Sequence, residues 1–151
     1  MVVAPGEGYL ASKLFTAGGD DVIKIPAFGG KSPFYTNDKP EPYIFMDGQE
    51  TFKFAVKKIV DDVKEVVSSA GMTLEEIDHI VLHQANTRIL DFAAKRLKIS
   101  KEKIIVNIDK YGNTAAASVP IAFDELAKSG RLKRGDTVVM SAFGGGLSSG
   151  T

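Results

Sequence analysis

From Asp47 onward the chain alternates between helix-like and strand-like patterns, and this alternation limits the possible folds more than any other feature. Helices are predicted in residues 48–71, 86–97 and 114–130, where apolar residues recur with helical spacing. Strands are predicted within residues 73–83, 103–108 and 134–146. The first helix would bury Phe52, Val56, Ile59, Val63 and Val66, and the second Ile89, Phe92, Ala93 and Leu97. Such alternation predicts an α/β fold with a largely parallel sheet covered by helices.

The first 46 residues follow a different pattern. The run "YLASKLFTAGGDDVIKI" predicts a β-hairpin around Gly18-Gly19-Asp20-Asp21. The next run, "PAFGGKSPFYTNDKPEPY", holds four of the six prolines and predicts an irregular surface connection. In the third helix, Pro120 leaves two possibilities: a kink at that residue, or a regular helix that begins only near Ser118.

Composition bounds the class of protein. With 151 residues, 44% of them hydrophobic and 25% charged, the chain fits one globular domain. Its 19 basic and 19 acidic residues cancel, and no stretch resembles a signal peptide or a membrane span, so we expect a cytoplasmic protein that binds neither nucleic acid nor membrane. Residues 88–103 carry a local basic excess, which could be a solvated helix face or a surface for an acidic partner.

Polar and glycine residues follow the ends of three predicted elements, in residues 83–86, 111–113 and 143–146. In α/β sheets ligands bind beyond the carboxyl ends of the strands, so these segments could meet at one site. Histidine, asparagine and bare glycine amides are hydrogen-bond donors, and such a set without a carboxylate suits an oxygen that becomes negative during reaction. Taken singly, Asn86 and Asn113 could be helix N-caps, and the glycines a tight turn.

Other motifs predict no function. Gly146 to Gly150 matches G-x-S-x-G, but both histidines precede it, whereas that nucleophile motif needs an acid and a histidine later in the chain. The same segment lacks the lysine of a phosphate-binding loop. His79 has no evident partner, and we expect a structural or surface role for it. No spacing of His, Asp and Glu predicts a metal site.

The motifs "HQANTRIL", "YGNTAAASVPIAFDE" and "AFGGGLSSG" resemble, in order and spacing, the C-terminal half of β-ketoacyl-acyl carrier protein synthase III, a thiolase-fold condensing enzyme. The resemblance is dense from about Asp47 onward. It implies one half of the two-half thiolase fold, with a mixed and mostly parallel sheet that lacks its last strand. Residues 1–46 would be the tail of the N-terminal half, and residues 47–151 the C-terminal domain.

The resemblance also implies roles for individual residues. His83 and Asn113 match the family's catalytic His and Asn, which stabilise the enolate oxygen formed when malonyl-acyl carrier protein loses carbon dioxide. Gly145 matches a glycine whose amide helps form a second oxyanion hole, beside the family's cysteine, and Phe143 would line the same site. The CoA and pantetheine contacts match Gly48, Phe52, Ala85, Asn86 and Ile89. Basic residues that dock the acyl carrier protein match Lys53, Arg88, Lys95 and Arg96.

The implied whole enzyme joins an acyl-CoA primer to malonyl-acyl carrier protein at the start of type II fatty acid synthesis, works as a homodimer and needs no cofactor. The family's nucleophilic cysteine lies in the N-terminal half, and this chain contains no cysteine. We therefore expect it to be inactive without that half. Three alternatives stay open: a starter enzyme of quinolone or polyketide synthesis, a non-catalytic module that binds CoA or acyl carrier protein, and a nucleotide-binding domain, which the missing phosphate-loop lysine disfavours.

Overall fold

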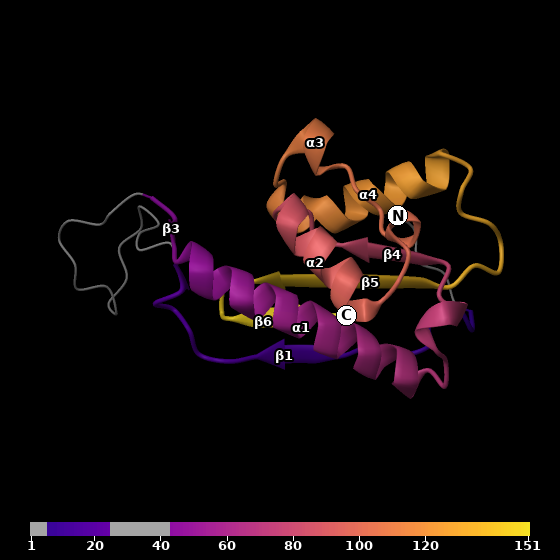
Figure 1. Ribbon diagram of the computed structural model, residues 1–151, viewed down its shortest axis with the longest axis horizontal. Helices are drawn as coiled ribbons and strands as arrows, with labels where there is room; N and C mark the ends of the chain where they lie inside the picture. The colour runs from indigo at the N-terminus through magenta and orange to yellow at the C-terminus, as the bar shows by residue number, and fades with distance from the viewer. Residues whose placement is uncertain (1–5, 25–42) are drawn as a thin grey trace.

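The computed structural model describes residues 6–24 and 43–151 and has three main helices, as predicted (Figure 1). These are α1 (Gly48–Ser69), α2 (Thr87–Leu97) and α4 (Ser118–Lys128). The one-turn helix α3 (Ile108–Tyr111) and the 3-10 turns η1 (Leu74–Glu76), η2 (Lys101–Lys103) and η3 (Ala115–Ala117) connect them. The strands are β1 (Leu14–Thr16), β2 (Ile23–Lys24), β3 (Phe45–Met46), β4 (His79–Leu82), β5 (Val138–Gly144) and β6 (Ser148–Gly150).

The helix ends follow from their capping residues. Asp47 caps α1 by accepting hydrogen bonds from the N–H groups of Gln49 and Glu50 at 2.9 and 3.0 Å. Just beyond that helix, Gly71 takes a positive φ of 71°, in agreement with the predicted stop. Because α4 begins at Ser118, Pro120 falls in its first turn, where no intrahelical N–H is needed. The second of the two possibilities for Pro120 is therefore correct.

Four strands form one mixed sheet in the order β1-β6-β5-β4. Only β4 and β5 pair in parallel, with His79 opposite Val138 and Leu82 opposite Ser141. The β5–β6 and β1–β6 pairs are antiparallel. The prediction of a mixed sheet is confirmed. The described part is less parallel than expected, because the glycine loop, residues 145–147, turns the chain directly back into β6. A strand therefore does follow that loop, although we expected the chain to lack it.

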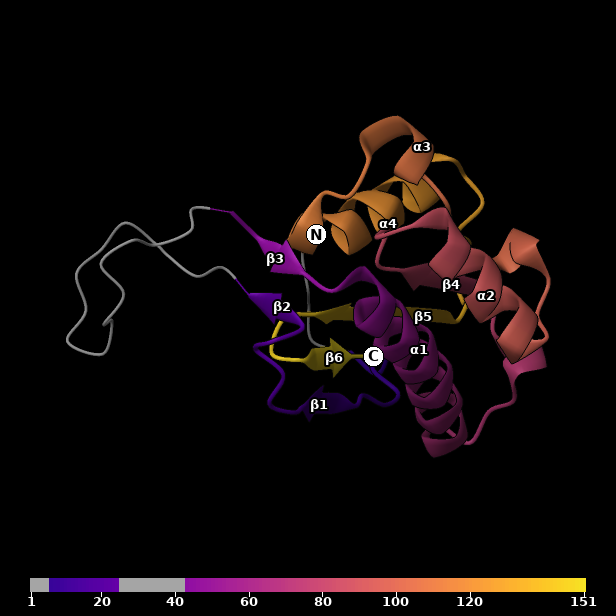
Figure 2. The same ribbon diagram turned by 60° about the vertical axis from the view of Figure 1, so that its left-hand side comes forward.

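The predicted hairpin between residues 9 and 25 is wrong. β1 pairs with β6 in the main sheet, whereas β2 pairs with β3 in a separate two-stranded ribbon. Residues 17–22, which connect β1 to β2, form a longer connection than most hairpin loops. The ribbon lies beside the N-terminal end of α1 (Figure 2). The predicted irregular connection falls almost wholly on residues outside the described ranges, and the division at residues 46 and 47 stays a prediction.

The strand predicted in residues 103–108 is also wrong. Only one bridge forms, between Ile104 and Ile80 in parallel orientation. The side chain of Gln84 takes the place of a neighbouring strand, because its amide nitrogen donates to Ile105 O at 3.0 Å and its carbonyl accepts from Asn107 N at 3.0 Å. A side chain thus satisfies backbone groups that a ladder would otherwise pair.

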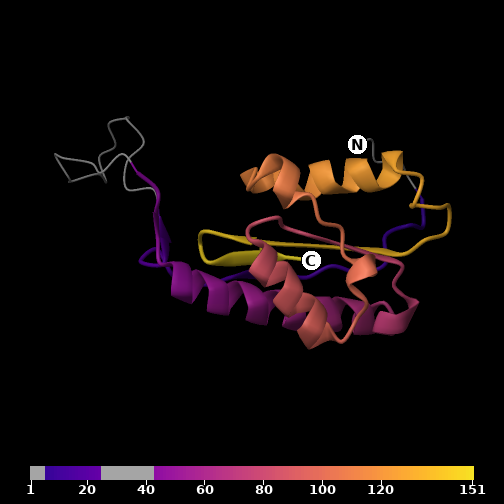
Figure 3. The same ribbon diagram turned by 45° about the horizontal axis from the view of Figure 1, so that its top comes forward.

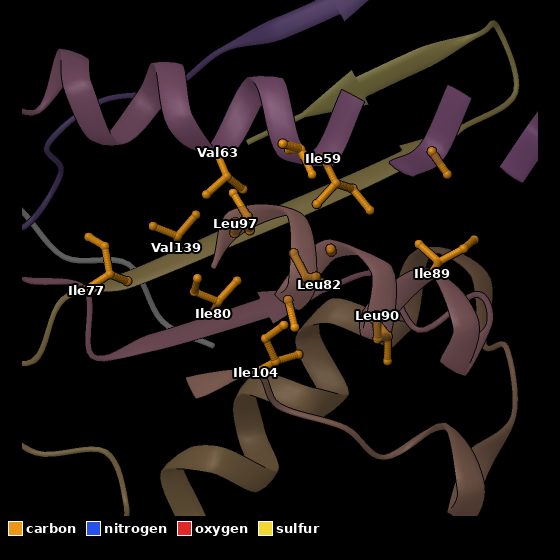
Figure 4. Close-up of a cluster of buried hydrophobic side chains, with 14 of the residues drawn as sticks. Ile59, Val63, Ile77, Ile80, Leu82, Ile89, Leu90, Leu97, Ile104 and Val139 are labelled. Atoms are coloured by element: carbon orange, nitrogen blue, oxygen red, sulfur yellow. The ribbon is translucent and has the colours of Figure 1, made fainter. Parts of the chain in front are cut away.

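Helices cover both faces of the sheet, with α1 and α2 on one side and α4 on the other (Figure 3). Strand β4 is buried on both faces: Ile80 and Leu82 join the α1–α2 core, whereas Val81 packs with Ala122 and Leu126 of α4. The larger cluster includes Ile59, Val63, Ile89, Leu97 and Val139 (Figure 4). The inward faces of the helices are largely as predicted. Phe92 is an exception, because 43% of its surface is exposed.

One carboxylate is buried in this architecture. Asp62, on the sheet-facing side of α1, is fully buried and accepts a hydrogen bond from Ser149 Oγ of β6 at 2.6 Å. Lys58 Nζ lies 2.9 Å from its Oδ1, and Lys13 Nζ lies 3.4 Å from the same atom. The group thereby joins the helix to the two antiparallel strands. No helix within the described ranges combines the length and apolarity needed to cross a bilayer.

Candidate functional site

A cavity of about 770 Å³ lies where the carboxyl end of β4, the start of α4 and the glycine loop meet. Every residue predicted to act in catalysis or to contact CoA lines it, although these residues come from widely separated parts of the sequence. They are Gly48, Phe52, His83, Ala85, Asn86, Ile89, Asn113, Phe143 and Gly145. The ribbon of β2 and β3 adds Ile23 and Met46 to the wall. The expected convergence at strand ends is therefore present as geometry, while the individual roles stay predictions.

His83 follows β4 directly and is half-buried in the cavity wall. Its Nδ1 lies 2.5 Å from Ser118 Oγ at the start of α4. Its ring packs edge-on against Phe143, with ring centroids 5.2 Å apart and an interplanar angle of 70°. Burial lowers the pKa of the His83 imidazole below its ordinary value of 6.5, because desolvation disfavours the charged form. The ring is therefore neutral near pH 7 and can donate one hydrogen bond.

Asn113 lies between α3 and η3, and its side chain is fixed at one end only. Its Oδ1 accepts from Ala115 N at 3.0 Å, while its Nδ2 has no acceptor among the described residues. The segment before it is held by Glu125 of α4, which accepts from Asn107 Nδ2 at 2.8 Å and from Tyr111 OH at 2.9 Å. Asn113 can thus offer an amide N–H to a ligand in the cavity.

Asn86 shows that the helix-cap explanation and a site role are compatible. It is the N-cap of α2, and its Oδ1 accepts from Arg88 N at 2.8 Å. The same residue lines the cavity. Asn113, in contrast, is not the N-cap of a helix: it closes a short turn ahead of η3.

The glycine loop, residues 145–147, is the tight turn of the β5–β6 hairpin. Gly145 is exposed in this turn, and its N–H has no acceptor among the described backbone and side-chain groups. At Gly146 the backbone itself requires glycine: its φ is 142°, and an added Cβ would lie only 2.2 Å from Ser148 Oγ. The tight-turn explanation is therefore correct, and the turn also borders the cavity.

The four predicted docking residues do not line the cavity but lie on the outer surface of α1 and α2. Lys53 and Arg96 border a separate groove of about 330 Å³, together with Phe52 and Phe92. Those two rings meet edge to face with centroids 5.7 Å apart, which explains why Phe92 is not in the core. The Arg88 guanidinium lies 5.9 Å from the Phe52 ring centroid.

The charges on this surface are mostly unpaired. Lys53 Nζ is paired with Glu50 Oε1 at 2.7 Å, one turn away on α1. Arg88, Lys95 and Arg96 are exposed and have no ion-pair partner within the part of the chain that the structure describes. The result is a basic surface beside the Phe52 wall of the cavity, which can attract an acidic partner.

Sequence reasoning missed two residues that shape the site. Gln84 is fully buried and holds residues 105–107, as described above. Ser118 is buried against both His83 and the Gln84 backbone. A serine at the start of a helix predicts a capping role, so its contact with a distant strand end left no signal in the sequence.

Among the described residues no group of three or more His, Asp and Glu side chains could hold a metal ion. The structural role expected for His79 agrees with its position: it is buried at the start of β4, and its Nε2 lies 3.0 Å from Asp136 Oδ2, a partner that the sequence did not reveal. That contact joins β4 to the loop before β5, at the opposite end of the strand from His83.

Comparisons with known proteins agree with this geometry. The family model described as "3-Oxoacyl-[acyl-carrier-protein (ACP)] synthase III C terminal" matches residues 67–151. The β-ketoacyl-[acyl-carrier-protein] synthase III of Rhodopirellula baltica is 44% identical over 148 residues, which are 96% of this chain and 43% of that protein. The enzyme of the same name from Caldanaerobacter subterraneus is 47% identical, over 96% of this chain and 45% of its own length. The chain thus spans less than half the length of these relatives.

A solved structure extends the similarity to three dimensions. The β-ketoacyl-[acyl carrier protein] synthase III of Thermus thermophilus superposes with a TM-score of 0.86 at 37% identity, covering 99% of this chain and 46% of that one. The predicted thiolase-like α/β fold is thereby confirmed.

Proposed function

Because this chain belongs to the 3-oxoacyl-[acyl-carrier-protein] synthase III family, we propose that it forms the part of a condensing enzyme that stabilises an enolate oxygen. The enzyme would join an acyl-CoA primer to malonyl-acyl carrier protein at the start of fatty acid synthesis. One observation carries the proposal: His83, Asn113 and Gly145, which follow different elements of the fold, line a single cavity. All three can donate hydrogen bonds, and none is an acid.

The chemistry follows from this donor set. The bond between the malonyl α-carbon and its carboxylate breaks, carbon dioxide leaves, and the electron pair forms an enolate whose oxygen is negative. Neutral His83 and the Asn113 amide donate to that oxygen. The enolate carbon then attacks the primer thioester, forming the new carbon–carbon bond and expelling the thiolate. A single oxyanion donor is worth about 3 kcal/mol in such reactions.

The thiol that carries the primer would come from outside these 151 residues, since they include no cysteine. In the proposed whole enzyme, the cysteine-bearing half would pack on this chain, and the complete protein would be a homodimer. Exposed apolar side chains support such packing: Leu14 is 85% exposed and Ile44 is 68% exposed. We propose that the chain alone carries out no condensation.

Substrate binding would follow the shape of the cavity and the charge beside it. We propose that Gly48, Phe52, Ala85 and Ile89 contact the pantetheine arm shared by CoA and acyl carrier protein, because they form an apolar wall of the cavity. The basic surface formed by Lys53, Arg88, Lys95 and Arg96 would receive the acidic carrier protein.

A second candidate is favoured by the absence of cysteine in the chain: a non-catalytic module that binds CoA or acyl carrier protein. Titration of this chain with malonyl-acyl carrier protein and with CoA, following both binding and released carbon dioxide, tests both proposals. Binding without carbon dioxide release is expected under either of them, because the half-enzyme also needs the other half for turnover. Carbon dioxide release would contradict the proposed inactivity, and no binding at all would contradict the non-catalytic module.

Substitution of His83 tests the role of the donors in the complete enzyme that contains this sequence. His83→Ala should lower the rate of malonyl decarboxylation by about 10²–10³ fold, since one oxyanion donor is lost. Acylation of the cysteine should change little. His79→Ala is the matched control, because His79 lies at the other end of the same strand. If His83→Ala abolished acylation and spared decarboxylation, the proposed role would be wrong.

A further inference from the structure

Ser118, the first residue of α4, makes two contacts with the end of β4. Its Oγ lies 2.5 Å from His83 Nδ1 and 3.3 Å from the backbone N of Gln84. Only 2% of its surface is exposed, so water does not compete for the hydroxyl. The three groups therefore have to satisfy one another's hydrogen-bonding needs.

The protons can be assigned by counting donors and acceptors. A backbone N–H can only donate, so the Gln84 N–H occupies one lone pair of Ser118 Oγ. The Ser118 hydroxyl proton then needs an acceptor, and His83 Nδ1 is the only one it has among residues 6–24 and 43–151. If Nδ1 carried the ring proton instead, Oγ would accept twice and its own O–H would be buried without a partner. Such an unsatisfied group costs about 1–3 kcal/mol.

We propose that Ser118 is a positioning residue that fixes the tautomer of His83. Its hydroxyl donates to Nδ1, so the single proton of the neutral ring resides on Nε2. Nε2 is then the ring nitrogen that donates toward a ligand in the cavity. The functional consequence rests on the enolate role proposed above for His83, whereas the tautomer itself does not.

Gln84 keeps this arrangement rigid. Its side chain is fully buried and makes three hydrogen bonds: to Leu82 O at 2.8 Å, to Ile105 O at 3.0 Å and from Asn107 N at 3.0 Å. The backbone at residue 84 therefore cannot rotate its N–H away from Ser118 without breaking these bonds. The serine is in turn carried by the first turn of a regular helix, α4. Ser118 Oγ and the Gln84 N–H that donates to it are thus both held by fixed elements.

Nitrogen NMR of this chain labelled with ¹⁵N-histidine tests the proposal directly. The chain has two histidines, so two sets of ring signals are expected, and a His79→Gln variant assigns them. At about pH 8, where imidazole is neutral, the wild-type His83 should show a protonated Nε2 and an unprotonated Nδ1. Ser118→Ala should shift the two nitrogen resonances toward each other, because both tautomers become populated.

Ser141→Ala is the matched control. Ser141 is equally buried at 2% and is next to His83, whose backbone N donates to Ser141 O, but its hydroxyl bonds to Thr151 Oγ1. This variant should leave the His83 resonances in place. A wild-type proton on Nδ1, or no shift in Ser118→Ala, would overturn the proposal. If the alanine variant does not fold, Ser118→Cys, a similar shape with a weaker donor, is read by the same two outcomes.

No substrate is needed for this measurement. A failure of the enolate role would appear as unchanged decarboxylation in His83→Ala, while the tautomer result would still hold. Conversely, a wrong tautomer would leave the decarboxylation result untouched. The two experiments therefore separate the two claims.

Discussion

The His83 ring is half-buried and makes one side-chain hydrogen bond, to Ser118. Its burial determines how protonation of the ring affects the stability of the fold. In the folded chain its pKa lies below 6.5, because burial disfavours the imidazolium. The unfolded chain takes up the proton at higher pH than the folded chain does. As pH falls through 6.5, protonation therefore favours the unfolded state, until the pH passes the folded-state pKa and the effect levels off.

The direction of this change in stability with pH can be checked by urea unfolding at about pH 7.5 and about pH 5.5. The wild-type free energy of unfolding should be lower at about pH 5.5 than at about pH 7.5. The difference should be smaller in His83→Gln, because glutamine does not titrate. The ¹⁵N signals of His83 give its pKa in the same samples. An NMR pKa at or above 6.5 would show that burial does not govern this residue.

Arg88 is expected to be the strongest single contributor to carrier-protein binding. It is exposed on the first turn of α2, and its guanidinium lies near the ring of Phe52, which lines the cavity. Arg88→Glu should weaken binding of an acidic carrier protein roughly tenfold at low salt, with a smaller effect as salt rises. Binding of free CoA should change much less. Isothermal titration at two salt concentrations measures both.

Lys64→Glu provides the matched charge reversal, since Lys64 is exposed on the last turns of α1, away from the four predicted docking residues. It should leave carrier-protein affinity nearly unchanged. Equal losses in the two variants would mean that net charge, and not this surface, governs binding.

At the scale of elements, the buried carboxylate of Asp62 joins α1 to the antiparallel edge of the sheet. Burial raises its pKa, but the hydrogen bond from Ser149 and the pairing with Lys58 and Lys13 outweigh this and hold the pKa below 3.8. The stability that it contributes is therefore present above pH 3.8 and is lost as pH falls through the lower, folded-state pKa.

Removal of this carboxylate should be costly. Asp62→Ala leaves Lys58 and the buried Ser149 hydroxyl without their partner, and we expect a loss of about 3 kcal/mol in the free energy of unfolding. Urea unfolding at neutral pH measures it. Asp61→Ala, one position away on the exposed face, should change stability by less than about 0.5 kcal/mol. Similar values for the two would rule out a special role for Asp62.

The elements also show what sequence patterns can predict. The three main helices were predictable because their apolar faces repeat with helical spacing over many residues. The strand in residues 103–108 was not, because the Gln84 side chain replaces its neighbour and no local pattern reveals that. The hairpin prediction failed for a similar reason: β1 takes its partner, β6, from the far end of the chain.

The candidate site likewise contains residues that the sequence could predict and residues that it could not. His83, Asn113 and Gly145 could be predicted to meet because each follows an element whose end faces the same edge of the sheet. Ser118 and Gln84 could not, because their partners lie in other segments: Ser118 contacts the end of β4, and the Gln84 side chain contacts residues 105 and 107. Sequence reasoning found the donors and missed the residues that hold them.

At the scale of the whole molecule, apolar side chains exposed on β1 and on residues 43–46 predict self-association. Leu14 is 85% exposed on β1, whose second edge has no partner among the described strands. Sedimentation velocity should therefore show species that grow with protein concentration, and Leu14→Lys should reduce them. Ser69→Lys adds the same charge at the exposed end of α1 as a control. A monomer at every concentration would contradict the prediction.

The pairing of β1 with β6 also determines the order in which parts of the sheet can form during synthesis. Leu14 is synthesised 136 residues before its partner Gly150. Helices α1 and α2 can form and meet long before that, since their contacts are local. Until Ser148 to Gly150 have left the ribosome, β1 has no strand partner and β5 has an unpaired edge, because β6 lies between them. Slow synthesis of residues 145–150 would prolong that interval, so a nascent-chain chaperone would act most usefully just before the β5–β6 hairpin closes.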